Sequence, residues 1–153
     1  MKHYLSILLV ILLCCFGCKG GGLPGLVQCS GVVTLDGKPL EGATVMLIPR
    51  DSSSSQRNAI GVTDAGGKFR MTTLKENDGV MPGTYTVTVT KFEKTGEVIT
   101  LPEIDPETKQ HITFEPSANR LPAAYEKNDS PLEITLPKGG IKTASFDLKS
   151  TSK

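Results

Sequence analysis

Polar and apolar residues alternate most regularly between Thr84 and Thr90. Tyr85, Val87 and Val89 fall on one side of an extended chain, and threonines fall on the other. Because successive side chains of a strand point to opposite faces, this pattern predicts a β-strand with one buried face and one solvent-exposed face. Such half-buried strands are typical of antiparallel sandwiches.

The stretch 31–47 predicts a strand, a turn and a second strand, which we interpret as a central hairpin. Val33 and Leu35 share one face of the first strand. Gly31 precedes them on that face and leaves room for another chain to approach. Asp36-Gly37 is a strong turn dipeptide, because glycine accepts positive φ and aspartate hydrogen-bonds its own backbone.

Strand-like alternation recurs in seven segments, and no segment has a persuasive helical period. Turn-forming runs such as 64–67 and 137–140 separate them, and the last two segments alternate as a C-terminal hairpin would. The sequence therefore predicts an all-β fold, a seven-stranded antiparallel Greek-key β-sandwich. Its expected strands are about 28–35, 43–48, 59–63, 68–72, 84–91, 132–136 and 143–148.

A long loop at about 92–124 interrupts the domain, which we place at 28–150. The loop carries Pro102, Pro106 and Pro116, and only 97–101 and 111–114 have the composition of short strands. A long connection inside a compact domain is either functional or a solvated insertion. We expect a partner to touch the protein here, and the alternative is a solvated insertion.

Short motifs along the chain resemble those of one fold family. They are the run 63–69, the run 82–89, and an opening set made of Gly31, Val33, Asp36, Gly37, Pro39, Gly42, Ala43 and Val45. In these motifs the chain from about 28 to 148 resembles carboxypeptidase-regulatory-like, transthyretin-like (prealbumin-like) domains, as in small bacterial secreted lipoproteins. The resemblance implies a prealbumin-like sandwich. It implies no particular function, because the matched residues form turns and core.

The N-terminus has the pattern of an export signal. A short basic start precedes an apolar run over 5–16, which is too short to span a bilayer, since that takes about 20 residues. Gly17-Cys18 resembles the lipobox junction of bacterial lipoproteins, where the thiol is acylated before cleavage. Cys15 and Phe16 depart from the usual lipobox residues. The alternative is an ordinary secretory signal that is cut just beyond Cys18.

We expect a lipoprotein signal peptide at 1–17, lipid attachment at Cys18 and a Gly-rich tether at 18–27. The lipid would anchor the protein in a membrane of the cell envelope, and Lys19, in place of an aspartate, favours the outer membrane. Cys29 is the only cysteine in the domain. We expect a half-buried apolar residue there rather than a reactive thiol. If Cys18 stays unmodified, a Cys18–Cys29 disulfide can form.

Charge and aromatic content argue against nucleic-acid binding. The chain has 17 Lys and Arg against 16 Asp and Glu, no Trp, 3 Tyr and 5 Phe. No predicted strand face carries a basic stripe with aromatic platforms, which a nucleic-acid surface would need.

The histidine count excludes most kinds of enzyme. The only two are His3, which leaves with the signal, and His111 in the long loop. One His and one Cys cannot supply the three or four ligands of a zinc site. No nucleophile-elbow motif accompanies His111. The catalytic residues of transthyretin-like hydrolases and the iron ligands of intradiol dioxygenases are also missing, so we expect no catalysis, metal or cofactor.

Two binding roles remain. The first is a non-enzymatic cell-envelope lipoprotein that acts as a structural or protein-binding module, since a sheet edge binds protein without a sequence signature. The alternative is a carbohydrate-binding module of the cell surface. Its candidate ligand-binding aromatics are Phe92, Phe114 and Tyr125, which are left over once the other aromatics are assigned to the core. The expected partners are therefore the membrane, and an envelope protein or a glycan.

Overall fold

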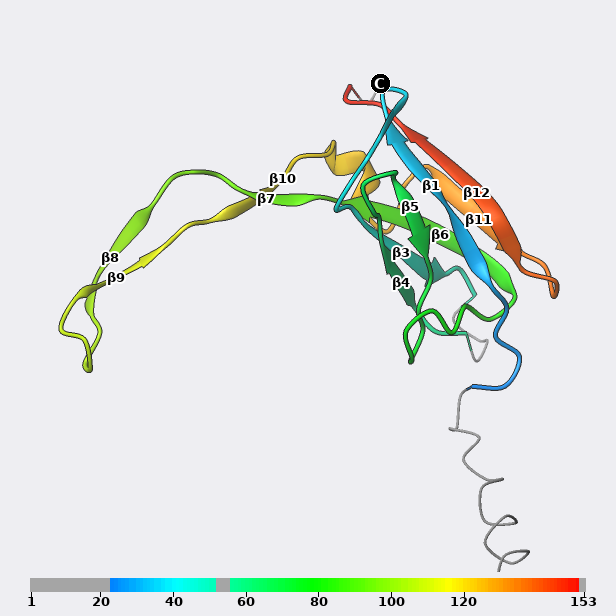
Figure 1. The fold of residues 1–153 in the computed structure, drawn as a ribbon, viewed down its shortest axis with the longest axis horizontal. Helices are drawn as coiled ribbons and strands as arrows, with labels where there is room; N and C mark the ends of the chain where they lie inside the picture. Colours follow the sequence, from blue (N-terminus) through cyan, green and yellow to red (C-terminus); the bar gives the residue numbers. More distant parts are fainter. Residues whose placement is uncertain (1–22, 52–55, 152–153) are drawn as a thin grey trace, which may run out of the picture.

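The alternating segments form strands in the computed structural model, which describes residues 23–51 and 56–151. Two sheets pack into an all-β sandwich, and one long β-arm projects from it (Figure 1). The predicted signal peptide at 1–17, Cys18 and the first part of the tether lie outside the described residues.

One sheet is built on β1, and we call it the β1 sheet. β12 pairs with one side of β1, while β2 and β5 pair with different parts of its other side. Asp36 and Gly37 both have positive φ, of 51° and 79°, which is the type I′ geometry of a two-residue hairpin between β1 and β2. The strands are β1 (Cys29–Leu35), β2 (Lys38–Pro39), β5 (Lys68–Arg70) and β12 (Ile141–Leu148).

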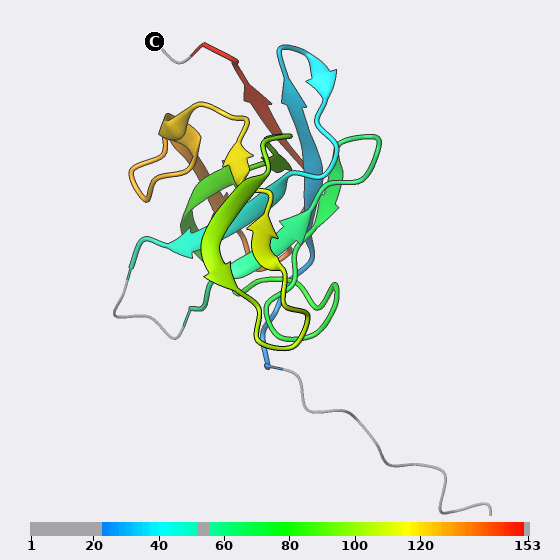
Figure 2. The same cartoon turned by 90° about the vertical axis from the view of Figure 1, so that its left-hand side faces the viewer.

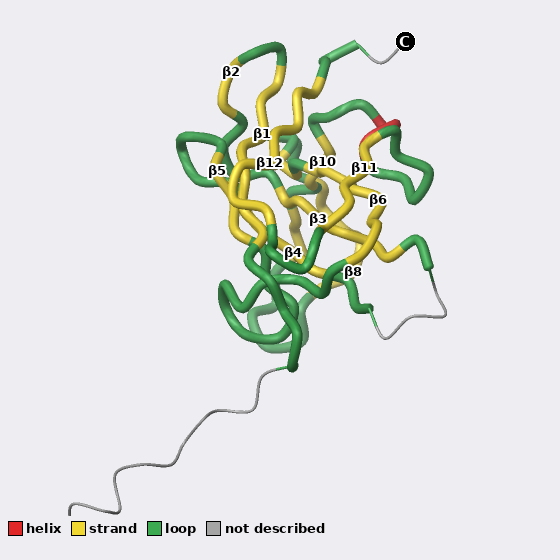
Figure 3. Tube along the Cα trace, turned by 90° about the vertical axis from the view of Figure 1, so that its right-hand side faces the viewer, coloured by secondary structure: helices red, strands yellow, loops and turns green. Residues whose placement is uncertain are grey.

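The other sheet, the β6 sheet, has the order β11-β6-β3-β4 and is antiparallel throughout. Figure 3 shows the two sheets as separate layers, with β1, β5 and β12 to the left and β3, β6 and β11 to the right. The strands are β3 (Thr44–Pro49), β4 (Ala59–Val62), β6 (Gly83–Thr90) and β11 (Leu132–Leu136).

The core lies between the two sheets. Val33, Phe69 and Phe146 enter it from the β1 sheet, and the rings of Phe69 and Phe146 stack with centroids 5.9 Å apart. Tyr85 and Val87 enter it from β6 with no exposed surface. The alternation in 84–90 therefore correctly predicts which face of β6 is buried.

The first and last strands of the sandwich correct one prediction. β1 and β12 run parallel, with Val33 opposite Phe146, so the fold is not antiparallel throughout. No short turn joins these two strands, so nothing requires them to run in opposite directions. Gly31 lies opposite Ala144, and a Cβ at Gly31 would lie 2.2 Å from the Ala144 carbonyl oxygen. The predicted close approach of another strand at Gly31 is thereby confirmed, and that strand is β12 of the same chain.

Two predicted hairpins are wrong. β1 and β3 lie in different sheets, and so do β11 and β12, so the central hairpin and the C-terminal hairpin are crossings from one layer to the other. Asp64-Ala65-Gly66-Gly67 does form a tight turn, but β4 and β5 also diverge into separate sheets. A single bridge, Ile60 to Thr72, joins the sheets on that side.

The segment expected to be a long loop at about 92–124 is mostly an extended antiparallel arm. Its four strands and the short β2 bring the number in the described chain to twelve, and each of the seven predicted strands has a counterpart. The arm projects from the end of β6 in Figure 1 and points toward the viewer in Figure 2. Its strands are β7 (Phe92–Lys94), β8 (Ile99–Ile104), β9 (His111–Phe114) and β10 (Ser117–Asn119), and the 3-10 helix η1 (Ala123–Tyr125) follows.

Within residues 23–51 and 56–151, no helix is long and apolar enough to cross a membrane.

Candidate binding site

The arm, residues 91–120, leaves the sandwich at a polar joint. Glu93 accepts contacts from Lys91 at 3.0 Å and from Arg120 at 3.2 Å. The hydrogen bond and charge of Lys91, followed by the charge of Arg120, lower the pKa of Glu93. Asn119 Oδ1 accepts hydrogen bonds from the backbone N–H groups of Lys91 and Leu121. Strands β7 and β10 are therefore tied together where the arm begins.

Strands β8 and β9 form the outer part of the arm, which we call the distal ribbon. Ile99 lies directly opposite Phe114, and Thr100 lies opposite Thr113. Since side chains alternate along a strand, Ile112 shares the face of Ile99 and Phe114. Leu101 follows two residues after Ile99 on the same strand. One face of the ribbon is therefore apolar.

This apolar face is uncovered in the described part of the chain. Phe114 is 47% exposed and Ile112 is 37% exposed. A two-stranded ribbon is at best marginally stable in water without a hydrophobic face packed on something else. Of nine exposed large hydrophobic residues in the described chain, six lie on the arm, which marks it as an interaction surface. They are Ile99, Ile112 and Phe114 on the apolar face, and Phe92, Val98 and Ile104 elsewhere on the arm.

The distal ribbon is also acidic. Residues 97–115 contain five carboxylates and one lysine, which gives 1 − 5 = −4. Asp105 turns the tip by accepting the backbone N–H groups of Thr108 and Glu107, which lower its pKa. Glu115 pairs with Lys94 at 3.1 Å. In the part of the chain that the structure covers, Glu97, Glu103 and Glu107 form no ion pair.

The three aromatic residues predicted for ligand binding do not form one site. Phe92, 59% exposed, lies at the base of the arm, and Phe114 lies on the distal ribbon. Tyr125 is only 7% exposed, and its hydroxyl accepts the backbone N–H of Lys149 at 3.0 Å. Tyr125 belongs to the core, so its assignment as an exposed aromatic is wrong. η1 turns the chain back to the sandwich and carries this side chain inward.

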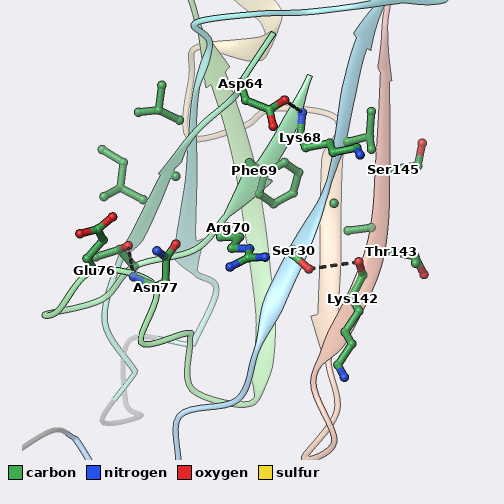
Figure 4. A pocket seen from close by; sticks show the side chains of 17 residues that line it. Ser30, Asp64, Lys68, Phe69, Arg70, Glu76, Asn77, Lys142, Thr143 and Ser145 are labelled. Atoms are coloured by element: carbon green, nitrogen blue, oxygen red, sulfur yellow. Dashed lines mark hydrogen bonds between the residues drawn. The ribbon is translucent and has the colours of Figure 1, made fainter. Parts of the chain in front are cut away.

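A second candidate surface is a hollow of about 1000 Å³ on the outer side of β12, β1, β5 and β4 (Figure 4). Val32, Ile60 and Val62 give it apolar surface. Outward-facing residues on neighbouring strands, Lys68, Arg70 and Lys142, give it positive charge. Sequence reasoning missed this surface. Its only signal is that Ile60 and Val62 are apolar on the wet side of their strand.

Basic charge exceeds acidic charge in the hollow. Its three basic residues face two acidic ones, Asp64 and Glu76. Asp64 is held in its turn, where its carboxylate accepts the backbone N–H groups of Gly66 and Lys68 at 2.9 Å each. Neither Lys68 nor Arg70 nor Lys142 forms an ion pair with a described residue. Their charges are therefore available to a ligand.

The two described side chains best suited to catalysis, an imidazole and a thiol, lie on different elements. His111 lies on the exposed arm, where its Nδ1 is 3.2 Å from the carbonyl oxygen of Leu101. Cys29 is buried at the start of β1, and burial raises the pKa of its thiol to about 11. That shift is opposite to what a nucleophilic thiol needs. No group of three His, Cys, Asp or Glu side chains in the described segments could hold a metal ion.

Comparison with known proteins gives no match to a family model, to a curated protein or to a solved structure.

Proposed function

We propose that the chain is a non-catalytic, protein-binding module of the cell envelope, and that its arm docks on the partner. The observation that carries the proposal is the uncovered apolar face of the distal ribbon, at the end of an arm whose two strands are joined at its base by the polar joint. Interfaces bury apolar side chains at their centre and surround them with polar groups. The distal ribbon has this composition, with Ile112 and Phe114 at the centre and carboxylates around them.

The proposed localisation of the protein in the cell envelope rests on its N-terminal sequence. A signal peptide at 1–17 and acylation of Cys18 would place the protein on a membrane, with the outer membrane favoured by Lys19. The test is the mass of the mature N-terminus from cells, for the parent chain and for Cys18→Ser. Acylation and membrane retention that are both lost in Cys18→Ser would support the anchor. An unmodified N-terminus beyond Cys18 would contradict it.

The finer fold assignment is part of the same proposal. Two layered sheets with a type I′ turn at Asp36-Gly37 are compatible with a prealbumin-like, Greek-key sandwich of the carboxypeptidase-regulatory-like type. In such a fold the seven predicted strands would be the common framework, and β7–β10 would be an insertion specific to this chain. Function would then reside in the insertion, because the framework residues serve turns and core.

A non-enzymatic role is supported by the separation of reactive groups. The hollow has serine and threonine hydroxyls but no histidine, and the Ser30 hydroxyl already donates to the carbonyl oxygen of Lys142 at 3.1 Å. His111 lies on the arm instead. A nucleophile with its base in hydrogen-bond reach is the minimum for covalent catalysis, and this pair is not assembled here.

Carbohydrate binding is the second candidate, and the burial of Tyr125 weakens it. Stacking on a sugar would depend on Phe92 and Phe114, which lie on different strand pairs of the arm. A glycan array with the parent chain and Phe114→Ala tests this. Binding that disappears in Phe114→Ala would replace the protein-binding proposal, and a lack of any signal would agree with it.

The protein-binding proposal is tested by crosslinking in intact cells. A tagged full chain is compared with Ile112→Asp, on the apolar face, and with Thr113→Asp, the next residue on the opposite face. We expect crosslinked protein with the parent and with Thr113→Asp, and a loss of about tenfold or more in Ile112→Asp, the size of a central interface residue. Equal yields from the two variants, or no crosslinked protein at all, would contradict the proposal.

A further inference from the structure

The distal ribbon and the hollow match each other in charge and in apolar character. The ribbon carries a net charge of −4 over residues 97–115 around an apolar face. The hollow carries three basic side chains around Ile60 and Val62, of which Val62 is 61% exposed. Complementary charge around apolar contact is the pattern that fixes register and selects partners at interfaces. Both halves of a matched interface are thus present on one chain.

We propose that the partner of the arm is a second copy of this chain, and that the distal ribbon of one copy lies in the hollow of the next. This inference rests on the proposed function, because it names the occupant of the same arm. Ile112 and Phe114 would cover Ile60 and Val62, while Glu97 and Glu103 would approach Lys68 and Arg70.

The arm is held away from the sandwich from which it comes. Figure 1 shows the distal ribbon projecting beyond the two sheets, and Ile112 and Phe114 remain exposed. Their exposure means that the chain's own sandwich does not cover them. The polar joint at Glu93 joins β7 to β10 at the base of the arm, and β7 follows directly after β6 of the sandwich. A contact between copies therefore needs no refolding of the arm.

The membrane surface is a weaker occupant for the same face. Cytoplasmic and many envelope leaflets carry anionic lipids, which attract basic segments and repel acidic ones. With five carboxylates and one lysine, the distal ribbon would be repelled by an anionic lipid surface. The hollow of a second copy offers basic groups to the same carboxylates.

The contact joins two different surfaces, so it is heterologous. It gives a closed pair when two copies exchange arms, and an open row of copies when they do not. In both cases the contact is the same, with the distal ribbon of one copy in the hollow of another. Photo-crosslinking between two tagged copies detects this contact in either assembly.

The experiment uses two differently tagged full chains expressed together. One carries a photo-crosslinking benzoylphenylalanine at position 114, and a matched control carries it at position 113, on the opposite face. We expect light to give a product with both tags from position 114, and peptide mass spectrometry to place the crosslink within residues 60–70 of the other copy. The yield from position 113 should be several-fold lower.

Charge reversal provides an independent readout. Lys68→Glu with Arg70→Glu in the receiving copy should lower the yield by about tenfold, because like charges then meet. Glu97→Lys with Glu103→Lys in the arm of the other copy should restore it. Loss without restoration would overturn the assigned contact.

The outcomes separate this inference from the proposed function. A crosslink from position 114 to a different protein would overturn the second copy as partner and keep the arm as a protein-binding element. A crosslink only within one chain would overturn the contact between copies. No crosslink to any protein would overturn both proposals.

Discussion

Removal of the outer arm should leave the sandwich intact. Ser117 pairs with Lys94, so a two-residue Asn-Gly turn can replace Thr95 through Pro116 and close a hairpin directly at that pair. The change deletes 22 residues, counted from 95 to 116. It deletes the distal ribbon and keeps the polar joint at the base of the arm.

The expected change in the free energy of unfolding is small. Shortening a 22-residue connection to two residues favours folding by about 2 kcal/mol at most in loop entropy. Against this, the variant loses the exposed Lys94–Glu115 ion pair, which contributes about 0–1 kcal/mol. It also loses the hydrogen bond from the N–H of Thr95 to the carbonyl of Pro116, about 0.5–1.5 kcal/mol. The net change therefore stays within about 2 kcal/mol of zero.

Urea unfolding followed by far-UV circular dichroism measures this difference against the parent chain. If the apolar residues of the distal ribbon packed on the sandwich, burial of about 1.5–3 kcal/mol for each of Ile99, Ile112 and Phe114 would be lost. A destabilisation of more than about 4 kcal/mol would therefore refute the assignment of the arm as an exposed docking element. The same variant should give no product in the crosslinking experiment in cells.

Three further predictions concern the sandwich. Tyr125→Phe should cost about 1–2 kcal/mol in urea unfolding, because the N–H of Lys149 loses its acceptor, and Tyr125→Ala about 3–5 kcal/mol; equal, near-zero effects would mean that the ring is not buried. Gly31→Ala should cost about 1–3 kcal/mol, since its Cβ meets the Ala144 backbone, and an unchanged urea midpoint would argue against the close approach of β12 to β1 at this position. Burial raises the pKa of Cys29 from 9.0 to about 11 because the folded chain disfavours the thiolate, so the free energy of unfolding is unaffected below pH 9 and falls by about 2–3 kcal/mol as pH rises through 11. Urea titrations at pH 8 and pH 11 should show a larger fall in the free energy of unfolding for the parent chain than for Cys29→Ala. An equal fall in both chains would contradict the raised pKa of the thiol.

Strand positions were predictable because burial of one face imposes a period of two. Tyr85, Val87 and Val89 show that period directly, and glycine at position 31 indicates the close approach of β12. Strand pairing was not predictable from the same pattern. A hairpin within one sheet and a crossing between two sheets point the same alternate residues at the core, so the segments at 132–136 and 143–148 read alike in both arrangements.

The extended shape of the arm, and the hollow altogether, escaped sequence reasoning for a different reason. Pro102, Pro106 and Pro116 indicate a loop, and only the short runs 97–101 and 111–114 have the composition of strands, which is too little to predict one continuous arm. Tyr125 resembled a leftover aromatic because its partner, the backbone of Lys149, lies 24 residues away. The hollow combines outward-facing residues of four strands, and only the order of those strands brings them together.

The parallel pairing of β1 with β12 also constrains how the protein is made. The Ser30 side chain bonds the carbonyl of Lys142, which is 112 residues further along the chain. A ribosome delivers the first strand well before its neighbour, and contacts between such distant residues slow folding. One edge of β1 therefore stays open until 141–148 has been synthesised. Until then the unpaired edge of β1 exposes backbone N–H and C=O groups with which another chain can pair, so this strand is a site of aggregation risk during synthesis.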